Sequence, residues 1–125
     1  MHALVVDDSR AIRSVIARML RGLGWTVSEA GNGQEAIDVL TELEFPPDIA
    51  LVDWNMPVMD GFTLVCAIRG DARFDDMRIM MVTTETEIER MQQALSAGAN
   101  EYMMKPFTQD SLIEKLGLLG LAAAA

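Results

Sequence analysis

Five short apolar runs divide the chain, and each is followed by a turn and a longer stretch with the periodicity of a helix. The runs cover residues 3–6, 25–30, 49–52, 79–82 and 101–104. The second run alternates between apolar and polar residues, as a strand near a sheet edge does, whereas the third is continuously hydrophobic, which is typical of a strand buried on both faces. Strands that alternate with helices predict an α/β fold. We expect a doubly wound, five-stranded parallel sheet with helices on both faces and the strand order 2-1-3-4-5.

The helices are predicted from apolar residues that recur three or four positions apart. Ser9 is suited to cap the first helix, and Gly22 is suited to end it. In the last two helices we expect Leu95 and Ile113 to face the core together with their apolar neighbours. The polar segment at residues 70–78 is expected to be a loop.

Composition indicates a single globular domain. The chain has 125 residues, of which 50% are hydrophobic and 23% are charged. We expect the domain to cover residues 1–121, and the four alanines at residues 122–125 to form a low-complexity tail.

Charge and cysteine content exclude several classes of partner. The net charge of −9 argues against a nucleic-acid binder, because neutralising phosphates requires clustered Lys and Arg. No apolar stretch approaches the ~20 residues needed to cross a bilayer, and the N-terminus carries no targeting pattern. The one cysteine fits a reducing compartment. We therefore expect a cytoplasmic monomer that binds neither nucleic acid nor membrane.

Four of the predicted strands end in polar side chains. Asp7 and Asp8 follow the first strand, Asp53 follows the third, Thr83 follows the fourth and Lys105 follows the fifth. In open parallel sheets, ligands bind at the carboxyl ends of the strands. We therefore expect three carboxylates, a hydroxyl and an ammonium group to meet at one edge of the sheet.

This combination of groups predicts a particular chemistry. Clustered carboxylates repel one another unless a cation joins them, and Mg²⁺ prefers their hard oxygen atoms. A carboxylate can also act as a nucleophile and become an aspartyl phosphate. Phosphoryl transfer depends mostly on positioning and on charge neutralisation, which Mg²⁺, Lys105 and the Thr83 hydroxyl can supply. The pattern therefore predicts an aspartate phosphorylation site with Asp53 as the acceptor.

The same residues form a recognisable set of motifs. The set comprises Asp7-Asp8, Asp53-Trp54-Asn55-Met56-Pro57, Asp60-Gly61, Val82-Thr83 and Lys105-Pro106-Phe107. In these motifs the chain resembles the response-regulator receiver family, from residue 3 to about residue 119. Within the family it is most similar to the CheY-like single-domain chemotaxis regulators, chiefly through residues 53–57.

The resemblance implies a role for each residue near the acid cluster. Asp53 takes a phosphoryl group from a histidine kinase, next to a bound Mg²⁺ ion. Asp8 holds this ion directly, Asp7 holds it mainly through water, and Asn55 holds it through its backbone carbonyl. Lys105 pairs with the phosphoryl group.

The resemblance also implies a conformational response. Thr83 and Tyr102 form a switch pair, in which the hydroxyl moves toward the phosphoryl group and the ring turns inward. The Lys105–Pro106 peptide bond is expected to be cis.

One position departs from the usual pattern of the family. The residue after the switch threonine is commonly Ala or Gly, and here it is Thr84. Its β-branched side chain is expected to narrow the approach to Asp53. Together with Asn55 and Glu85, it is expected to tune the lifetime of the phosphorylated state.

Two functions of different kinds fit these residues. The first is a phosphorylation-activated switch without an output domain, which regulates a flagellar motor switch protein or a similar effector by binding it. The second is a phosphate sink or phosphotransfer intermediate that binds no effector. A scaffold that is never phosphorylated is disfavoured by the presence of the acid cluster, Thr83 and Lys105. Because no substrate pocket is indicated, we do not expect an enzyme beyond its own phosphorylation and dephosphorylation.

Overall fold

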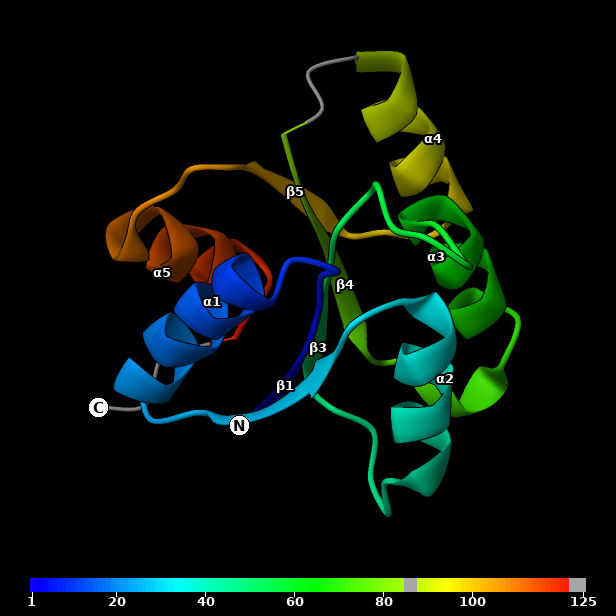
Figure 1. Ribbon diagram of the computed structural model, residues 1–125, viewed down its shortest axis with the longest axis horizontal. Coiled ribbons are helices and arrows are strands. Elements are labelled where there is room, and N and C mark those ends of the chain that lie inside the picture. The colour runs from blue at the N-terminus through cyan, green and yellow to red at the C-terminus, as the bar shows by residue number, and fades with distance from the viewer. Residues whose placement is uncertain (85–87, 122–125) are drawn as a thin grey trace.

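A twisted sheet of five parallel strands forms the centre of the protein (Figure 1). The computed structural model describes residues 1–84 and 88–121. The strands lie in the order β2-β1-β3-β4-β5, which confirms the predicted fold class and strand order. They are β1 (His2–Val6), β2 (Thr26–Ala30), β3 (Ile49–Val52), β4 (Arg78–Thr83) and β5 (Glu101–Met104).

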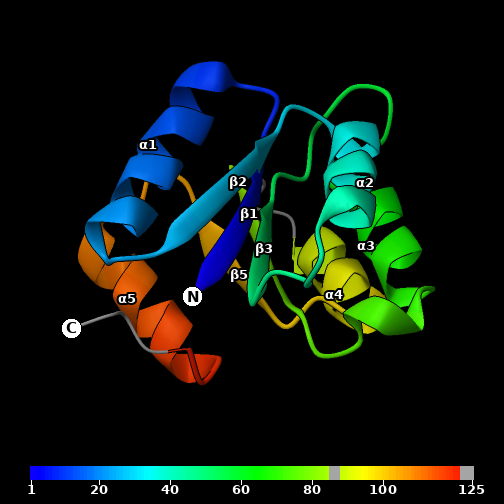
Figure 2. The same ribbon diagram turned by 90° about the horizontal axis from the view of Figure 1, so that it is seen from below.

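Helices cover both faces of the sheet, as the alternating pattern predicts. They are α1 (Arg10–Gly22), α2 (Gly33–Glu42), α3 (Gly61–Arg69), α4 (Ile88–Ala97) and α5 (Gln109–Leu118). Figures 1 and 2 show α1 and α5 on one face and α2, α3 and α4 on the other. Each face has its own apolar core, because the strand residues point alternately to the two sides. Within the described part of the chain, no helix is long and apolar enough to span a bilayer.

Side-chain caps fix where the helices begin after the strand-end loops. Ser9 accepts a hydrogen bond from the Ile12 amide at the start of α1, as predicted. Asn32, Asp60 and Thr108 cap α2, α3 and α5 in the same way. A capped start satisfies backbone N–H groups that otherwise have no partner in the helix. The loops that carry the strand-end residues are therefore anchored at both ends.

Two predicted core positions are wrong. Leu95 on α4 and Ile113 on α5 are 40% and 39% exposed, whereas their neighbours Ala94 and Leu112 are buried. Successive residues on a helix are separated by about 100° around its axis. A small error in the predicted orientation of the apolar face therefore assigns the buried position to the residue next to the one that is buried. A small residue at position 94 lets α4 pack closely, and the larger Leu95 side chain is left at the surface.

The segment at residues 70–78 contains more structure than the predicted loop. A 3₁₀ turn, η1 (Ala72–Phe74), buries the ring of Phe74 against the core. Arg69 joins this turn to the start of β5, because its guanidinium donates to the Phe74 and Gly98 carbonyls and to the Asn100 side chain. The polar composition of the segment conceals this one buried aromatic anchor.

Candidate functional site

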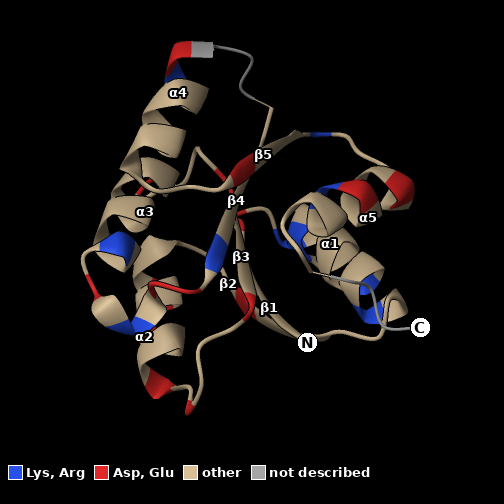
Figure 3. Cartoon of the chain, turned by 180° about the vertical axis from the view of Figure 1, so that it is seen from behind, with Lys and Arg blue, Asp and Glu red and all other residues tan. Residues whose placement is uncertain are grey.

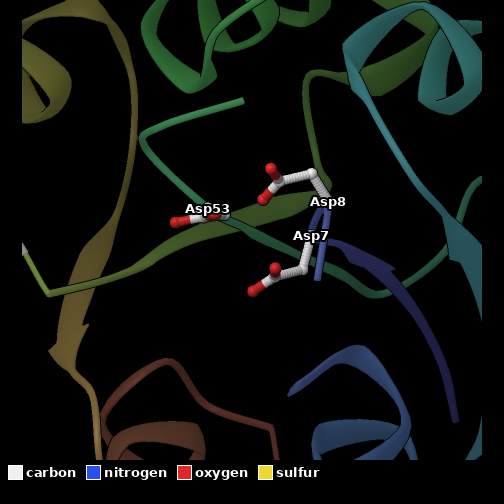
Figure 4. Close-up of side chains that lie close together, drawn as sticks. All are labelled: Asp7, Asp8 and Asp53. Atoms are coloured by element: carbon white, nitrogen blue, oxygen red, sulfur yellow. The ribbon is translucent and has the colours of Figure 1, made fainter. Parts of the chain in front are cut away.

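Three carboxylates meet at the carboxyl ends of β1 and β3 (Figure 4). One oxygen atom from each of Asp7, Asp8 and Asp53 lies within 4.8 Å of the other two. The register pairs Val6 with Val52, so the residues that follow these two strands leave the sheet side by side. Asp7 and Asp53 are only 1% and 8% exposed, whereas Asp8 is exposed. The predicted meeting of strand-end carboxylates is thus confirmed.

Lys105 brings a positive charge to this cluster from the far side of β4. Its Nζ lies 2.7 Å from Asp7 Oδ2 and 3.4 Å from Asp53 Oδ1. The Lys105 amide donates to the Thr83 carbonyl, which extends the pairing of β4 and β5 by one residue. The Lys105–Pro106 bond is cis, as the resemblance implies.

The electrostatic balance of the cluster favours an added cation. The pKa of Asp53 is raised from 3.8 to about 6. Burial is the largest cause, the Lys105 ammonium lowers the pKa, and the Asp7 and Asp8 carboxylates raise it. One ammonium therefore does not compensate for burial and for the two neighbouring carboxylates. The donor set is made of hard carboxylate oxygens, which suit a divalent ion such as Mg²⁺. The acid cluster can therefore hold a metal ion.

Backbone contacts hold the loop that carries Asp7 and Asp8. The Asp7 amide donates to the Ala30 carbonyl of β2, and the Ser9 amide donates to Asp7 Oδ1 at 2.8 Å. Arg13, on α1, donates to the Asp7 carbonyl at 2.7 Å. The Asp7 carboxylate thus accepts from both Ser9 and Lys105, and its orientation is fixed.

Gly61 allows the loop after β3 to return closely to Asp53. A Cβ atom at this position would overlap the main-chain oxygen of Asp53. The Gly61 amide instead donates to the Trp54 carbonyl at 2.9 Å and closes the loop. A residue without a side chain is required where two backbone segments approach this closely.

Thr83 and Tyr102 lie on neighbouring strands, on the same face of the sheet. Tyr102 is in register with Met81, and Thr83 lies two residues beyond Met81 on the same strand. Thr83 is 2% exposed at the end of β4, and the Tyr102 ring is half-buried. The Lys115 ammonium of α5 lies 5.1 Å from the centre of the Tyr102 ring. This arrangement suits the predicted switch pair, whose role stays a prediction.

The three predicted tuning residues fall at different places. Asn55 is exposed in the loop after β3. Thr84 is exposed just beyond β4 and lines an apolar groove with Lys105, Pro106 and residues of α1. Glu85 lies outside the described residues. The tuning roles of all three stay predictions.

Two residues near the site have no counterpart among the sequence predictions. Arg13 contacts the backbone of the acidic loop, and Val58 adopts a left-handed conformation with a φ of 69° in the loop after β3. A charged helix residue gives no signal that it binds a backbone carbonyl. For Val58 the sequence signal points the other way, because β-branched residues rarely adopt positive φ.

The chain matches a family model over nearly its whole length. Residues 3–117 match the model described as the response regulator receiver domain. The chain belongs to this family. Its fold, its acid cluster and Lys105 are therefore those of a receiver domain, which is not a conventional enzyme.

Relatives with chemotaxis names resemble this receiver domain closely. It is 46% identical over 117 residues to a chemotaxis protein CheY homolog of Campylobacter jejuni, covering 93% of this chain and 89% of the relative. It superposes on the chemotaxis protein CheY4 of Vibrio cholerae with a TM-score of 0.87 and 36% identity, covering 94% and 97% of the two chains.

A solved receiver domain with a bound metal is also similar. It belongs to a sensor histidine kinase of Pseudomonas aeruginosa and carries a magnesium ion coordinated in its active-site cleft. The two chains share 28% identity and a TM-score of 0.84, with 95% of this chain and 97% of the other covered.

Proposed function

We propose that this receiver domain is a phosphorylation-activated signalling switch of a two-component system. It takes a phosphoryl group from a histidine kinase onto Asp53 and regulates an effector by binding it. The observation that carries the proposal is the buried Asp53 carboxylate, which lies among Asp7, Asp8 and Lys105 at the carboxyl edge of the sheet. The chemotaxis names of the relatives support a role in chemotaxis. We propose a flagellar motor switch protein as the effector and the cytoplasm as the place of action.

The transfer step uses the Asp53 carboxylate as a nucleophile. One carboxylate oxygen attacks the phosphorus of the kinase's phosphohistidine. The P–N bond breaks, its electron pair returns to the imidazole nitrogen, and an acyl phosphate forms on Asp53. A carboxyl group with a pKa of about 6 is largely ionised at neutral pH, so the nucleophile is available.

Positive charge at the site offsets the charge of the phosphoryl oxygens. Lys105, 3.4 Å from Asp53 Oδ1, is placed to pair with them. Asp7, Asp8 and Asp53, with the Asn55 carbonyl, would hold Mg²⁺, which supplies further charge neutralisation when bound. The Thr83 hydroxyl supplies a hydrogen-bond donor at the end of β4.

The output of the switch is the face formed by α4, β5 and α5. In the phosphorylated state the Thr83 hydroxyl donates to the phosphoryl group, and Tyr102 takes a more inward position on β5. The effector reads this change through Tyr102 and the neighbouring Lys115. Asn55, Thr84 and Glu85 set how long the phosphorylated state lasts.

Labelling with a small phosphoryl donor tests the acceptor. Incubation with acetyl phosphate and MgCl₂ should add one phosphoryl group, detected by intact-mass spectrometry, and Asp53→Asn should abolish it. Asp48→Asn is the matched control, because Asp48 is an exposed carboxylate just before β3, at the opposite end of that strand. Undiminished labelling of Asp53→Asn would disprove the assignment.

Effector binding separates the switch from a phosphate sink. A purified motor switch protein should retain the wild-type chain more strongly after treatment with the phosphoryl donor. It should retain Asp53→Asn equally with and without that treatment. A chain that is labelled on Asp53 but binds no motor switch protein in either state would support the sink instead.

A further inference from the structure

Arg13 reaches from α1 toward the loop that carries two of the three carboxylates. Its Nη1 donates to the Asp7 carbonyl at 2.7 Å, and its Nε donates to Glu29 Oε1 at 3.3 Å. The side chain is 18% exposed, compared with 54% for Arg21 on the same helix. The guanidinium therefore joins three segments: α1, the β1–α1 loop and β2.

The bond to the Asp7 carbonyl fixes one peptide plane in particular. The Asp7 carbonyl and the Asp8 amide belong to the same planar peptide group, so holding one fixes the other. In an extended strand the side chains of Asp7 and Asp8 would point to opposite faces. Here both carboxylates lie with that of Asp53 inside 4.8 Å, so the chain must turn at this peptide. Arg13 holds that turn.

We propose that Arg13 is a positioning residue for the metal site: it orients the Asp7–Asp8 peptide so that Asp8 faces Asp53. This inference rests on the proposed Mg²⁺ site and deepens it. None of the three carboxylates of the cluster is bonded to Arg13, which holds only a backbone carbonyl and Glu29 among the contacts of the described residues. Groups that orient metal ligands without touching the ion typically contribute about 10- to 100-fold to metal affinity.

Glu29 orients the guanidinium and also supplies a matched control. Its Oε1 pairs with Arg13, and its Oε2 pairs with Arg21 at 3.5 Å. Both arginines lie on α1, where basic residues are spaced along the helix (Figure 3). Arg21 donates to the Val27 carbonyl on β2 rather than to the acidic loop. Replacing Arg21 thus removes an ion pair with the same partner and leaves the Asp7–Asp8 peptide held.

The test compares Arg13→Met with Arg21→Met in the full chain. MgCl₂ is titrated while Trp54 fluorescence and the amide resonances of Asp8 and Ser9 are followed. Arg13→Met should weaken Mg²⁺ binding about tenfold or more, and Arg13→Lys should recover part of the loss, since a lysine can donate one bond to the carbonyl. Arg21→Met should keep the wild-type affinity. Urea denaturation of each variant measures the purely structural effect.

A measurement on the metal-free protein tests the role of Arg13 independently of the proposed metal site. In the metal-free protein, the Asp8 and Ser9 amide resonances should shift in Arg13→Met and stay in place in Arg21→Met. Unchanged Mg²⁺ affinity in a folded Arg13→Met chain would overturn the inference, as would an equal loss in Arg21→Met. If the wild-type chain fails to bind Mg²⁺, the proposed metal site is wrong, and the metal-free amide shifts alone decide whether Arg13 holds the loop.

A second variant covers the case in which Arg13→Met does not fold. Glu29→Gln keeps Arg13 and removes only the charge that orients it. Glu29→Gln should also weaken Mg²⁺ binding, by a smaller factor than Arg13→Met. Unchanged Mg²⁺ affinity in Glu29→Gln would count against the role of Arg13.

Discussion

Lys105 and Asp7, 98 positions apart in the chain, form a 2.7 Å ion pair with both side chains almost fully buried. The Lys105 ammonium lies closer to Asp7 than to Asp53, at 2.7 Å against 3.4 Å. Much of its charge is therefore engaged by a carboxylate other than that of Asp53, the proposed acceptor. Burial is the main cause that raises the pKa of Asp53, and the shared Lys105 ammonium does not bring it below about 6.

The raised pKa of Asp53 predicts a pH-dependent stability in the metal-free protein. The folded chain holds the Asp53 proton more tightly than the unfolded chain, whose carboxyl has an ordinary pKa of 3.8. The stability from this group is therefore complete below pH 3.8 and is lost as the pH rises through about 6. The full loss corresponds to at most about 3 kcal/mol.

Asp53→Asn should remove this dependence, because the amide does not titrate. In EDTA at pH 7.5, we expect the variant to be about 2–3 kcal/mol more stable than the wild type, and the two to converge near pH 4. Urea denaturation between pH 4 and 8 measures the difference. Parallel curves for the two proteins would show that Asp53 titrates normally.

Asp8→Ala should weaken Mg²⁺ binding and relieve repulsion in the metal-free state. The loss of one direct ligand should lower the affinity at least tenfold, and the metal-free variant should be no less stable than the wild type. Trp54 fluorescence reports binding, because its residue follows Asp53 directly. The second tryptophan, Trp25, is buried in the core on the α1 and α5 face. A Trp54→Phe variant gives the fluorescence that Trp25 alone contributes. Parental affinity in Asp8→Ala would place the metal elsewhere.

Thr84→Ala should shorten the life of the phosphorylated state. Thr84 is exposed beside Lys105, and removing its γ-methyl and hydroxyl groups widens the approach to Asp53. We expect dephosphorylation to be about two- to tenfold faster, a change of about 0.4–1.4 kcal/mol in the barrier. The half-life is measured after removal of the phosphoryl donor, with Thr63→Ala, an exposed threonine on α3, as the control. An unchanged or longer half-life contradicts the steric argument.

Thr83→Ala should disconnect the site from the α4, β5 and α5 face. The hydrogen bond from the Thr83 hydroxyl to a phosphoryl group is charge-assisted and is worth about 1.5–3 kcal/mol, enough to shift a two-state population about tenfold or more. Amide shifts on adding beryllofluoride with Mg²⁺ should reach Tyr102 and Lys115 in the wild type and be much smaller there in Thr83→Ala. An equal response of these residues in both proteins means that Thr83 is not the relay.

Val58→Asn should stabilise the protein. Val58 has a φ of 69° and is 83% exposed, so it holds an unfavourable backbone conformation without burying its side chain. Asparagine tolerates this conformation better than a β-branched residue, and we expect a gain of about 1 kcal/mol. The control is Val15→Asn, because Val15 is exposed at 49% but lies within α1. Urea denaturation should separate the two variants, and a loss of stability in Val58→Asn contradicts the strain argument.

The sequence predicted the sheet and the acid cluster well, for a physical reason. A parallel strand buried on both faces is continuously apolar, so the first polar residue after it marks the edge of the sheet. The same rule predicts that Asp7, Asp53 and Lys105 meet at one edge of the sheet, and the structure confirms it.

Three other features depend on causes that the pattern of apolar and polar side chains does not record. The exposure of Leu95 depends on how α4 is rotated against α3, and the hydrophobicity of one residue does not determine that rotation.

 Leu95 is therefore exposed where the spacing indicated a buried residue. The contact of Arg13 could not be predicted, because its partner is a backbone carbonyl and the pattern of side chains carries no signal for such a bond. Val58 could not be predicted, because its conformation is set by the closure of the loop around Gly61 and not by its own preference.

The strand order has a consequence for the protein during its synthesis. Asp7, Asp8 and Asp53 all precede β4 and β5, and Lys105 follows β5 directly. A nascent chain therefore carries every carboxylate of the cluster while the ammonium that faces them is still inside the ribosome. Unfinished or C-terminally truncated copies lack that charge, so their clustered carboxylates repel one another without compensation from Lys105.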